Sequence, residues 1–262
     1  MAKIFKSIEP GGRADYGLYG SKAMAGMAAG VFSNLALAIF LPLKGRWKWL
    51  RLAFVIGSLN NLFNILRLLY YSKLGRFKQR ERLLDLTEMR PDARVLDIGS
   101  RNGLLAIGAA KRSPGLKVTA VDDWKYGGSE ETLRSNTDLE EVGGRVHVYD
   151  ADPHQLSFPD SSFEVILSDF YLHKIGRKER GIGQEKSLKG KARQTWRRQE
   201  RAKALSELDR VLAPGGVMVL SDIAHTTEYA EFLKEQNYSV HTYGPYRDIA
   251  LPLKVVVAKK PM

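Results

Sequence analysis

Acidic side chains stand at or beside the ends of three predicted strands, where they could bind a cationic ligand. The first strand leads into VLDIGSRNG, which places Asp97 before a glycine turn, and the second ends at Asp122 and Asp123. A third ends at Ala151 and Asp152, whose backbone N–H and carboxylate could meet a ring nitrogen and an exocyclic amine. Three acidic strand ends around one crevice suit a cationic nucleoside better than a pyrophosphate, which they would repel.

The turn after the first strand could bring the backbone close to a ligand. Gly99 and Gly103 permit a tight turn, and the helix that follows offers unpaired N–H groups at its start. About twenty residues later, Asp122 is placed to accept hydrogen bonds from a ribose diol. Taken alone, this pair of features is also compatible with a dinucleotide-binding enzyme.

Two histidines follow predicted strands, His173 after the fourth and His225 after the fifth. An imidazole accepts a proton near neutral pH, so either could be a general base, and Tyr171 is a further catalytic candidate. Each could equally be a rim or wall residue that only contacts a loop. The sequence has no cysteine and its 5 histidines do not cluster, so no metal site is predicted.

Strands and helices alternate from residue 94 onward. The predicted strands are 94–99, 117–122, 145–151, 163–172, 217–224, 239–243 and 254–260. The predicted helices are 104–112, 130–141, 197–212 and 227–236. This alternation predicts an α/β fold with a mostly parallel sheet that helices cover on both faces, and with ligands at the carboxyl ends of the strands.

Residues 70–260 resemble the class I S-adenosylmethionine-dependent methyltransferases. The motifs that carry this resemblance are VLDIGSRNG, VDDW, YDADPHQLSFPDSSFEVILSD and RVLAPGGVMVLSDI. The chain is also similar to membrane-anchored small-molecule and lipid methyltransferases, in which an apolar pair precedes a helix like YYSKLGRFKQRERLLDL and an LH pair follows the fourth strand. The resemblance implies a Rossmann-like seven-stranded sheet with an antiparallel last strand, and S-adenosyl-L-methionine as cofactor.

The resemblance also implies which residues bind the cofactor. These are Tyr71, Gly75, Asp97, Gly99, Ser100, Arg101, Gly103, Asp122, Asp123, Trp124, Ala151, Asp152, Ser168 and Asp169. By region, Asp97, Gly99 and Gly103 would line the methionine part, Asp122 the ribose, Trp124 the adenine or ribose, Asp152 the adenine amine, Ser168 and Asp169 the sulfonium, and Tyr71 and Gly75 the N-terminal side.

One position departs from the family pattern. Arg101 stands where a glycine is usual, two places after Gly99. The guanidinium could point outward and pair with the methionine carboxylate, which we favour, or it could block the pocket and leave a non-catalytic scaffold.

Positive charge is concentrated in two segments of a chain whose net charge is +12. Residues 1–82 carry +11, residues 174–203 carry +9, and the remainder carries −8. Such separation is expected when a protein meets a polyanion, either an anionic membrane or a nucleic acid, although solvated charge that only aids solubility is an alternative. The segment 174–203 is longer than a connection requires, and we interpret it as a basic insertion that gates substrate and touches the membrane, with RNA binding or a solvated loop as alternatives.

Residues 1–70 are predicted to be a helical membrane-associating segment before a methyltransferase domain at 71–262. Residues 23–43 run without a charge for about the length that spans a bilayer, and a weaker apolar stretch follows at 52–66. The two could form a hairpin, with asparagines 60, 61 and 64 facing the partner helix, or the second could lie in the interface. A secretory signal and a buried soluble helix pair are the alternatives.

These patterns predict methyl transfer to an amphipathic or lipid-like acceptor at a membrane surface, with the catalytic domain facing the cytoplasm. Basic residues flank the apolar pair on both sides, which favours this orientation only modestly because the connecting loop is basic too. An RNA or protein methyltransferase that docks through 174–203 is the alternative enzyme, and a scaffold with the same fold is the alternative without catalysis.

Overall fold

The computed structural model describes residues 14–18, 20–42, 44–87, 89–177, 188–247 and 252–262, which fall into two compact units. The sheet unit contains the described residues up to Tyr16, from Lys78 to Tyr246, and from 252 to the end. The helical unit contains Gly17–Phe77 and Arg247. The helical unit is thus inserted between Tyr16 and Lys78, whereas the sequence placed a single boundary after residue 70.

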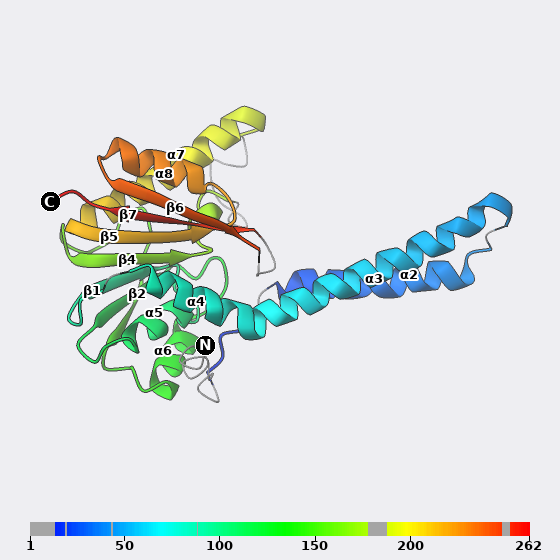
Figure 1. Ribbon diagram of the computed structural model, residues 1–262, viewed down its shortest axis with the longest axis horizontal. Helices are drawn as coiled ribbons and strands as arrows, with labels where there is room; N and C mark the ends of the chain where they lie inside the picture. The colour runs from blue at the N-terminus through cyan, green and yellow to red at the C-terminus, as the bar shows by residue number, and fades with distance from the viewer. Residues whose placement is uncertain (1–13, 19, 43, 88, 178–187, 248–251) are drawn as a thin grey trace. The chain divides into compact units, whose positions relative to one another are not determined.

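A seven-stranded sheet with the order β3-β2-β1-β4-β5-β7-β6 forms the centre of the sheet unit (Figure 1). The strands are β1 (Arg94–Ile98), β2 (Lys117–Asp122), β3 (Val146–Asp150), β4 (Phe163–Asp169), β5 (Leu212–Asp222), β6 (Ser239–Tyr246) and β7 (Leu253–Lys259). Strands β1 to β5 pair in parallel, and β7 runs antiparallel to both β5 and β6. The predicted α/β, Rossmann-like sheet of seven strands is confirmed.

Helices connect these strands. They are α4 (Arg76–Asp85), α5 (Leu104–Ala110), α6 (Glu130–Leu139), the short 3-10 turn η3 (Leu172–Lys174), α7 (Gly190–Val211) and α8 (Thr226–Glu235). Helix α7 begins well before the predicted residue 197, so much of the described part of the basic insertion is helical. Residues 178–187 of that insertion lie outside the described residues. Strand β4 ends before the predicted residue 172 because Phe170 turns the chain with a φ of 54°.

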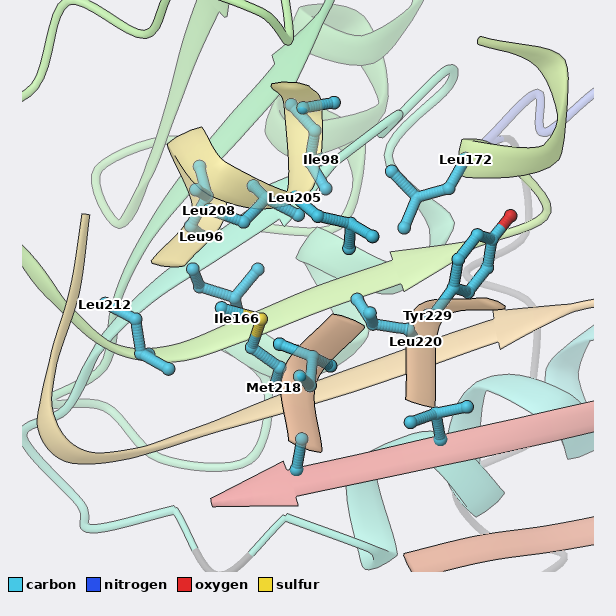
Figure 2. Packing of buried hydrophobic residues seen from close by; sticks show 14 of the residues in the cluster. Leu96, Ile98, Ile166, Leu172, Leu205, Leu208, Leu212, Met218, Leu220 and Tyr229 are labelled. Carbon is cyan, nitrogen blue, oxygen red and sulfur yellow. The ribbon is translucent and has the colours of Figure 1, made fainter. Parts of the chain in front are cut away.

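Apolar residues of neighbouring strands and one face of α7 form the core (Figure 2). Leu96 of β1 and Ile166 of β4 are fully buried, together with Leu205 and Leu208 of α7. Burial of apolar surface stabilises a domain by roughly 25 cal/mol for each Å² removed from water. This packing fixes the strands from which the functional side chains project.

The helical unit is an antiparallel hairpin. It consists of α2 (Ser21–Phe40), the 3-10 turn η1 (Gly45–Lys48), α3 (Trp49–Tyr70) and the π-helical turn η2 (Tyr71–Gly75). Asn61 faces Gly30, and a Cβ added to Gly30 would lie 2.6 Å from the Asn61 amide nitrogen. Asn34 likewise faces Gly57, where an added Cβ would lie 2.9 Å from the Asn34 amide nitrogen. These glycines let the helices approach closely. Asn61 faces the partner helix as predicted, whereas the Asn64 side chain donates to the Asn60 carbonyl of its own helix at 2.8 Å.

The outer surface of the hairpin is apolar and exposed. Phe32 is 74% exposed, Phe40 80% and Leu59 60%. Both helices are long and apolar enough to cross a membrane, and only 6% of each apolar window is buried. A helix pair inside the core of a single soluble chain would hide such side chains, so the described hairpin is not part of such a core.

Candidate active site

The sheet order brings four acidic strand ends to one edge. Asp97 lies in β1, and Asp122, Asp169 and Asp222 are the last residues of β2, β4 and β5. These four strands are consecutive neighbours and parallel, so their carboxyl ends meet at the same edge. The structure therefore places the predicted Asp97, Asp122 and Asp169 at one edge of the sheet, and it adds Asp222, which the sequence did not indicate.

The glycine turn after β1 has the conformation that its residues require. Gly99 has a φ of 80° and Gly103 a φ of 85°, both in the left-handed region that favours glycine. The Gly99 N–H donates to the Val121 carbonyl at 2.8 Å, and the Ser100 hydroxyl donates to the Asp97 carbonyl at 2.7 Å. These bonds hold the turn against β2.

Asp122 is fixed by two backbone donors. Its Oδ2 accepts from the Arg101 N–H at 2.8 Å, and its Oδ1 accepts from the Trp124 N–H at 2.7 Å. Arg101 and Trp124 both have positive φ values, 51° and 56°. Burial raises the pKa of Asp122, and the two N–H bonds oppose that shift. The carboxylate thus joins the loops after β1 and β2 and keeps further lone pairs for a ligand.

The Arg101 side chain lies beside the loop after β2, where its Nη2 would be 3.5 Å from a Cβ on Gly127. Arg101 thus adopts the left-handed backbone conformation that favours glycine, and this conformation is costly for an arginine.

Asp97 is buried and Asp169 is half-buried, and each has a carboxyl oxygen that is shielded from solvent and unsatisfied. Within the described residues, Asp97 Oδ2 and Asp169 Oδ1 have no hydrogen-bond partner. Burial, with a contribution from Asp169, raises the pKa of Asp97 to about 7. Burial, with a contribution from Asp222, raises the pKa of Asp169 to about 7 as well. Two such groups favour a cationic partner, because a cation would stabilise their charged forms.

These raised pKa values predict that affinity for a cationic ligand rises with pH. Between pH 6 and pH 7.5 both carboxyls lose their protons, and binding of S-adenosylmethionine should strengthen by about tenfold in titration calorimetry. The folded form holds more protons than the unfolded form between about pH 4 and pH 7, so the free energy of unfolding without ligand should fall over that range. In Asp97→Asn both slopes should be reduced; an unchanged slope would contradict the assignment.

The third acidic strand end is arranged differently from the prediction. The Ala151 N–H donates to the Asp122 carbonyl at 3.2 Å, so it is not available to a ring nitrogen as the sequence suggested. Partial burial alone would raise the pKa of Asp152. The hydrogen bonds from His154 outweigh this effect, so the pKa of Asp152 is lowered. Asp152 accepts from the His154 N–H, and its carboxylate lies 2.6 Å from His154 Nδ1. Asp123 lies 3.3 Å from the Lys125 ammonium.

His173 is placed against a buried carboxylate. Its Nδ1 lies 2.5 Å from Asp222 Oδ1, and its backbone N–H donates to Asp222 Oδ2 at 2.9 Å. The Tyr229 hydroxyl also donates to Asp222 Oδ2, at 3.2 Å. The Nδ1–Oδ1 pair does not have hydrogen-bond geometry, so the ring is placed beside the carboxylate by this close contact and by the backbone bond. A carboxylate beside one imidazole nitrogen can orient the ring for proton exchange at the other nitrogen. The sequence indicated His173 but missed Asp222 and Tyr229, whose pairing depends on the β4–β5 register.

His225 has a more structural environment. It is the residue before α8, with a φ of 64°, and its Nδ1 lies 3.5 Å from Glu228. Burial and the Arg201 charge lower the pKa of His225. Glu228 itself makes two bonds with the buried Arg201, at 2.9 Å and 2.8 Å. His225 therefore packs against an ion pair between α7 and α8 rather than against Asp222.

Lys174 and Tyr126 also lie near the acidic strand ends, because the charges of Asp122, Asp169 and Asp222 act on Lys174, and the sequence indicated neither residue. The Tyr126 hydroxyl donates to the Lys174 carbonyl at 2.7 Å, and the Lys174 ammonium lies 5.8 Å from the Tyr126 ring centre. Burial and the Arg101 charge lower the pKa of Lys174 to about 8. Their places in the sequence could have indicated them, because Tyr126 lies two residues after the VDDW motif and Lys174 directly follows His173.

Tyr171 is not suited to accept a proton. It is 1% exposed, and its hydroxyl has no partner within the described residues. Burial and nearby acidic residues raise the pKa of Tyr171, so the phenol stays protonated. Ser168 is fully buried and donates to the Ile98 carbonyl at 3.1 Å, which ties β4 to β1.

Tyr71 and Gly75 belong to the helical unit, in the π-helical turn η2. They contact each other, because a Cβ on Gly75 would lie 2.8 Å from the Tyr71 ring. Their predicted place at the cofactor site stays a prediction.

The fold and this set of strand-end residues agree with the comparisons to known proteins. Residues 96–220 match the family model of a methyltransferase domain. A demethylmenaquinone methyltransferase from Thermus thermophilus is 28% identical over 141 residues, which are 54% of this chain and 52% of that protein. The chain therefore matches about half the length of this curated relative.

Solved structures share the architecture. The [4+2]-cyclase SpnF superposes with a TM-score of 0.56 at 13% identity, over 73% of this chain and 83% of that one. This likeness shows the fold alone. The family match over residues 96–220 and the curated relative both support a methyltransferase domain in the sheet unit, and the sheet order is that of the class I S-adenosylmethionine-dependent methyltransferase fold.

Proposed function

We propose that this protein uses S-adenosylmethionine to methylate an amphipathic, lipid-like acceptor at the surface of an anionic membrane. The observation that carries the proposal is the pairing of a methyltransferase domain with a hairpin whose apolar side chains are exposed. The Thermus thermophilus relative is a demethylmenaquinone methyltransferase, which supports an isoprenoid quinone as the acceptor class.

The donor set of the crevice fits the cofactor. The unsatisfied oxygens of Asp97 and Asp169 suit the ammonium and sulfonium of the methionine part, and Asp122 suits the ribose hydroxyls. The guanidinium of Arg101 would pair with the methionine carboxylate. When bound, the cofactor supplies an electrophilic methyl group, so the protein contributes mainly by positioning the acceptor and managing a proton.

On the acceptor side, His173 would take the proton that the acceptor loses. The acceptor proton would pass to the imidazole beside Asp222 as the acceptor atom takes up the methyl group. The ammonium of Lys174 would hold a negatively charged acceptor oxygen, because an anionic partner would offset the desolvation and the Arg101 charge that lower its pKa.

The hairpin would confine the enzyme to the layer in which its acceptor dissolves, which raises the effective concentration without new contacts. The exposed Lys189, Lys191 and Arg198 at the start of α7 would add attraction to anionic lipid, about 1 kcal/mol for each charge near the surface. The catalytic domain would face the cytoplasm, where anionic lipid is enriched.

Vesicle flotation tests the membrane part of this proposal. The full chain should float with vesicles of phosphatidylcholine and phosphatidylglycerol, whereas Phe32→Asp combined with Leu59→Asp should stay at the bottom. Both positions are near the middle of a helix, where an aspartate in lipid costs about 3 kcal/mol. Tyr243→Asp places the same charge on the exposed edge strand β6 and should float normally.

Flotation of the double aspartate variant would reject a hairpin in the bilayer. The RNA-binding alternative makes the opposite prediction, because binding would then need no vesicles and would fall steeply with salt.

A further inference from the structure

The space above Gly99 is already filled. An ideal Cβ on Gly99 would lie 2.1 Å from Cγ of Tyr171, 2.3 Å from its Cβ and 2.5 Å from its Cδ2. A glycine in this turn is useful to a ligand because the ligand can approach the backbone where a side chain is missing. Here that room is taken by the base of the Tyr171 side chain, so a ligand that approached Gly99 would collide with it.

Packing, and not its hydroxyl, holds the Tyr171 ring in this place. The ring is 1% exposed and meets the Tyr126 ring edge-on, with centres 6.1 Å apart and planes at 74°. Its hydroxyl is buried without a partner among the described residues. A buried hydroxyl without a hydrogen bond costs free energy, so the observed position of the ring is unfavourable for the Tyr171 hydroxyl.

Hydrogen bonds join the loop after β2 to the turn after β4, which carries Tyr171. The Tyr126 hydroxyl, from the loop after β2, donates to the carbonyls of Lys174 at 2.7 Å and Arg177 at 3.3 Å, beyond β4. Phe170, directly before Tyr171, has a φ of 54°, which a phenylalanine rarely adopts. The segment that carries Tyr171 thus begins at a strained residue and is held at its far end by hydrogen bonds to one tyrosine.

We propose that Tyr171 is a gate for the cofactor, closed in the arrangement described above and opened when the segment that carries Tyr171 moves away from Gly99. Tyr126 would latch the gate through its bonds to the turn after β4. This inference rests on the proposed use of S-adenosylmethionine. A gate differs from a wall in the sign of its effect, because a wall residue contributes contacts to the bound cofactor, whereas a gate competes for the same space.

Affinity for S-adenosylmethionine in variants of Tyr171 tests the gate. Tyr171→Ala should bind on the order of tenfold more tightly than the wild type, the factor expected when a tenth of the molecules are open. Tyr126→Phe, which lacks only the latching hydroxyl, should show a smaller increase. Tyr171→Phe should equal the wild type, because the ring remains and the missing hydroxyl has no partner. Titration calorimetry gives the affinity, and stopped-flow fluorescence should show a faster association rate for Tyr171→Ala.

Loss of the buried ring could unfold the protein, so circular dichroism and thermal melting of each variant accompany the titrations. Tyr171→Gly, which also removes the Cβ that lies over Gly99, provides a second open variant and should also bind more tightly. Wild-type binding together with equal or weaker binding in folded Tyr171→Ala or Tyr171→Gly would overturn the gate and leave the proposed function intact. Failure of the wild type and both open variants to bind would overturn both.

Discussion

Replacement of His173 by alanine is expected to lower kcat by about 10²- to 10⁴-fold, the usual contribution of a positioned general base. The imidazole Nδ1 lies 2.5 Å from Asp222 Oδ1, and in the proposed reaction this carboxylate would orient the ring for proton transfer. The assay would use demethylmenaquinol in detergent micelles and S-adenosylmethionine carrying a labelled methyl group. The affinity for S-adenosylmethionine, measured by calorimetry, should stay close to that of the wild type, because His173 is assigned to the acceptor side.

Two variants separate a catalytic His173 from a structural one. Asp222→Asn should lower kcat and shift the pH profile, since the carboxylate that orients the ring is replaced by an amide. His147→Ala removes an exposed histidine of β3 and should leave kcat unchanged. A folded His173→Ala enzyme with wild-type kcat across the pH range would show that the histidine is only a wall residue.

The second large effect is expected at the ribose site. Asp122→Ala should raise the dissociation constant of S-adenosylmethionine by about 1.5–3 kcal/mol, or roughly 10- to 150-fold, which is the value of hydrogen bonds to a charged group. The carboxylate also holds the N–H groups of Arg101 and Trp124, so its loss would loosen both loops that line the site. Titration calorimetry at pH 7.5 measures the change.

Asp150→Ala is the matched control for this effect. Asp150 ends β3, pairs in register with Asp122 and is exposed, so its removal should leave the affinity unchanged. Equal losses in the two variants would indicate a general effect of negative charge at this edge, and no loss in Asp122→Ala would reject its assignment to the ribose.

Much of the sheet could be predicted because its strands have a local signature. The strand KVTAVD occupies the predicted range, and the acidic ends Asp97, Asp122 and Asp169 lie where strand–helix alternation places them. A buried parallel strand is a short apolar run between turn residues, and this pattern is visible without knowledge of its neighbours.

The remaining features depend on contacts between distant parts of the chain. Asp222 meets His173 only through the pairing of β4 with β5, and Ala151 loses its N–H to the Asp122 carbonyl only through the pairing of β2 with β3. Tyr171 over Gly99 likewise requires two chain segments to meet across the sheet edge. A pattern in neighbouring residues cannot predict these contacts, because each one joins residues from separate segments of the chain.

The domain boundary shows the same limit. Asp15 exchanges hydrogen bonds with Asn136 of α6, its N–H donating to Oδ1 at 2.8 Å and its carbonyl accepting from Nδ2 at 2.9 Å. Tyr16 donates to Glu140 at 3.1 Å. Residues before the apolar hairpin therefore belong to the sheet unit, and a truncation that removed residues 1–67 would also remove these contacts.

The decisive measurement is mass spectrometry of lipid extracts from cells that produce either the wild-type protein or Asp122→Ala. The wild type should yield a membrane-soluble compound heavier by one methylene group, with the added carbon labelled when the cells receive methyl-labelled methionine, and the variant should yield much less of it. Identical lipid extracts from the two strains, with the label found instead in RNA or protein, would contradict methylation of a lipid-like acceptor.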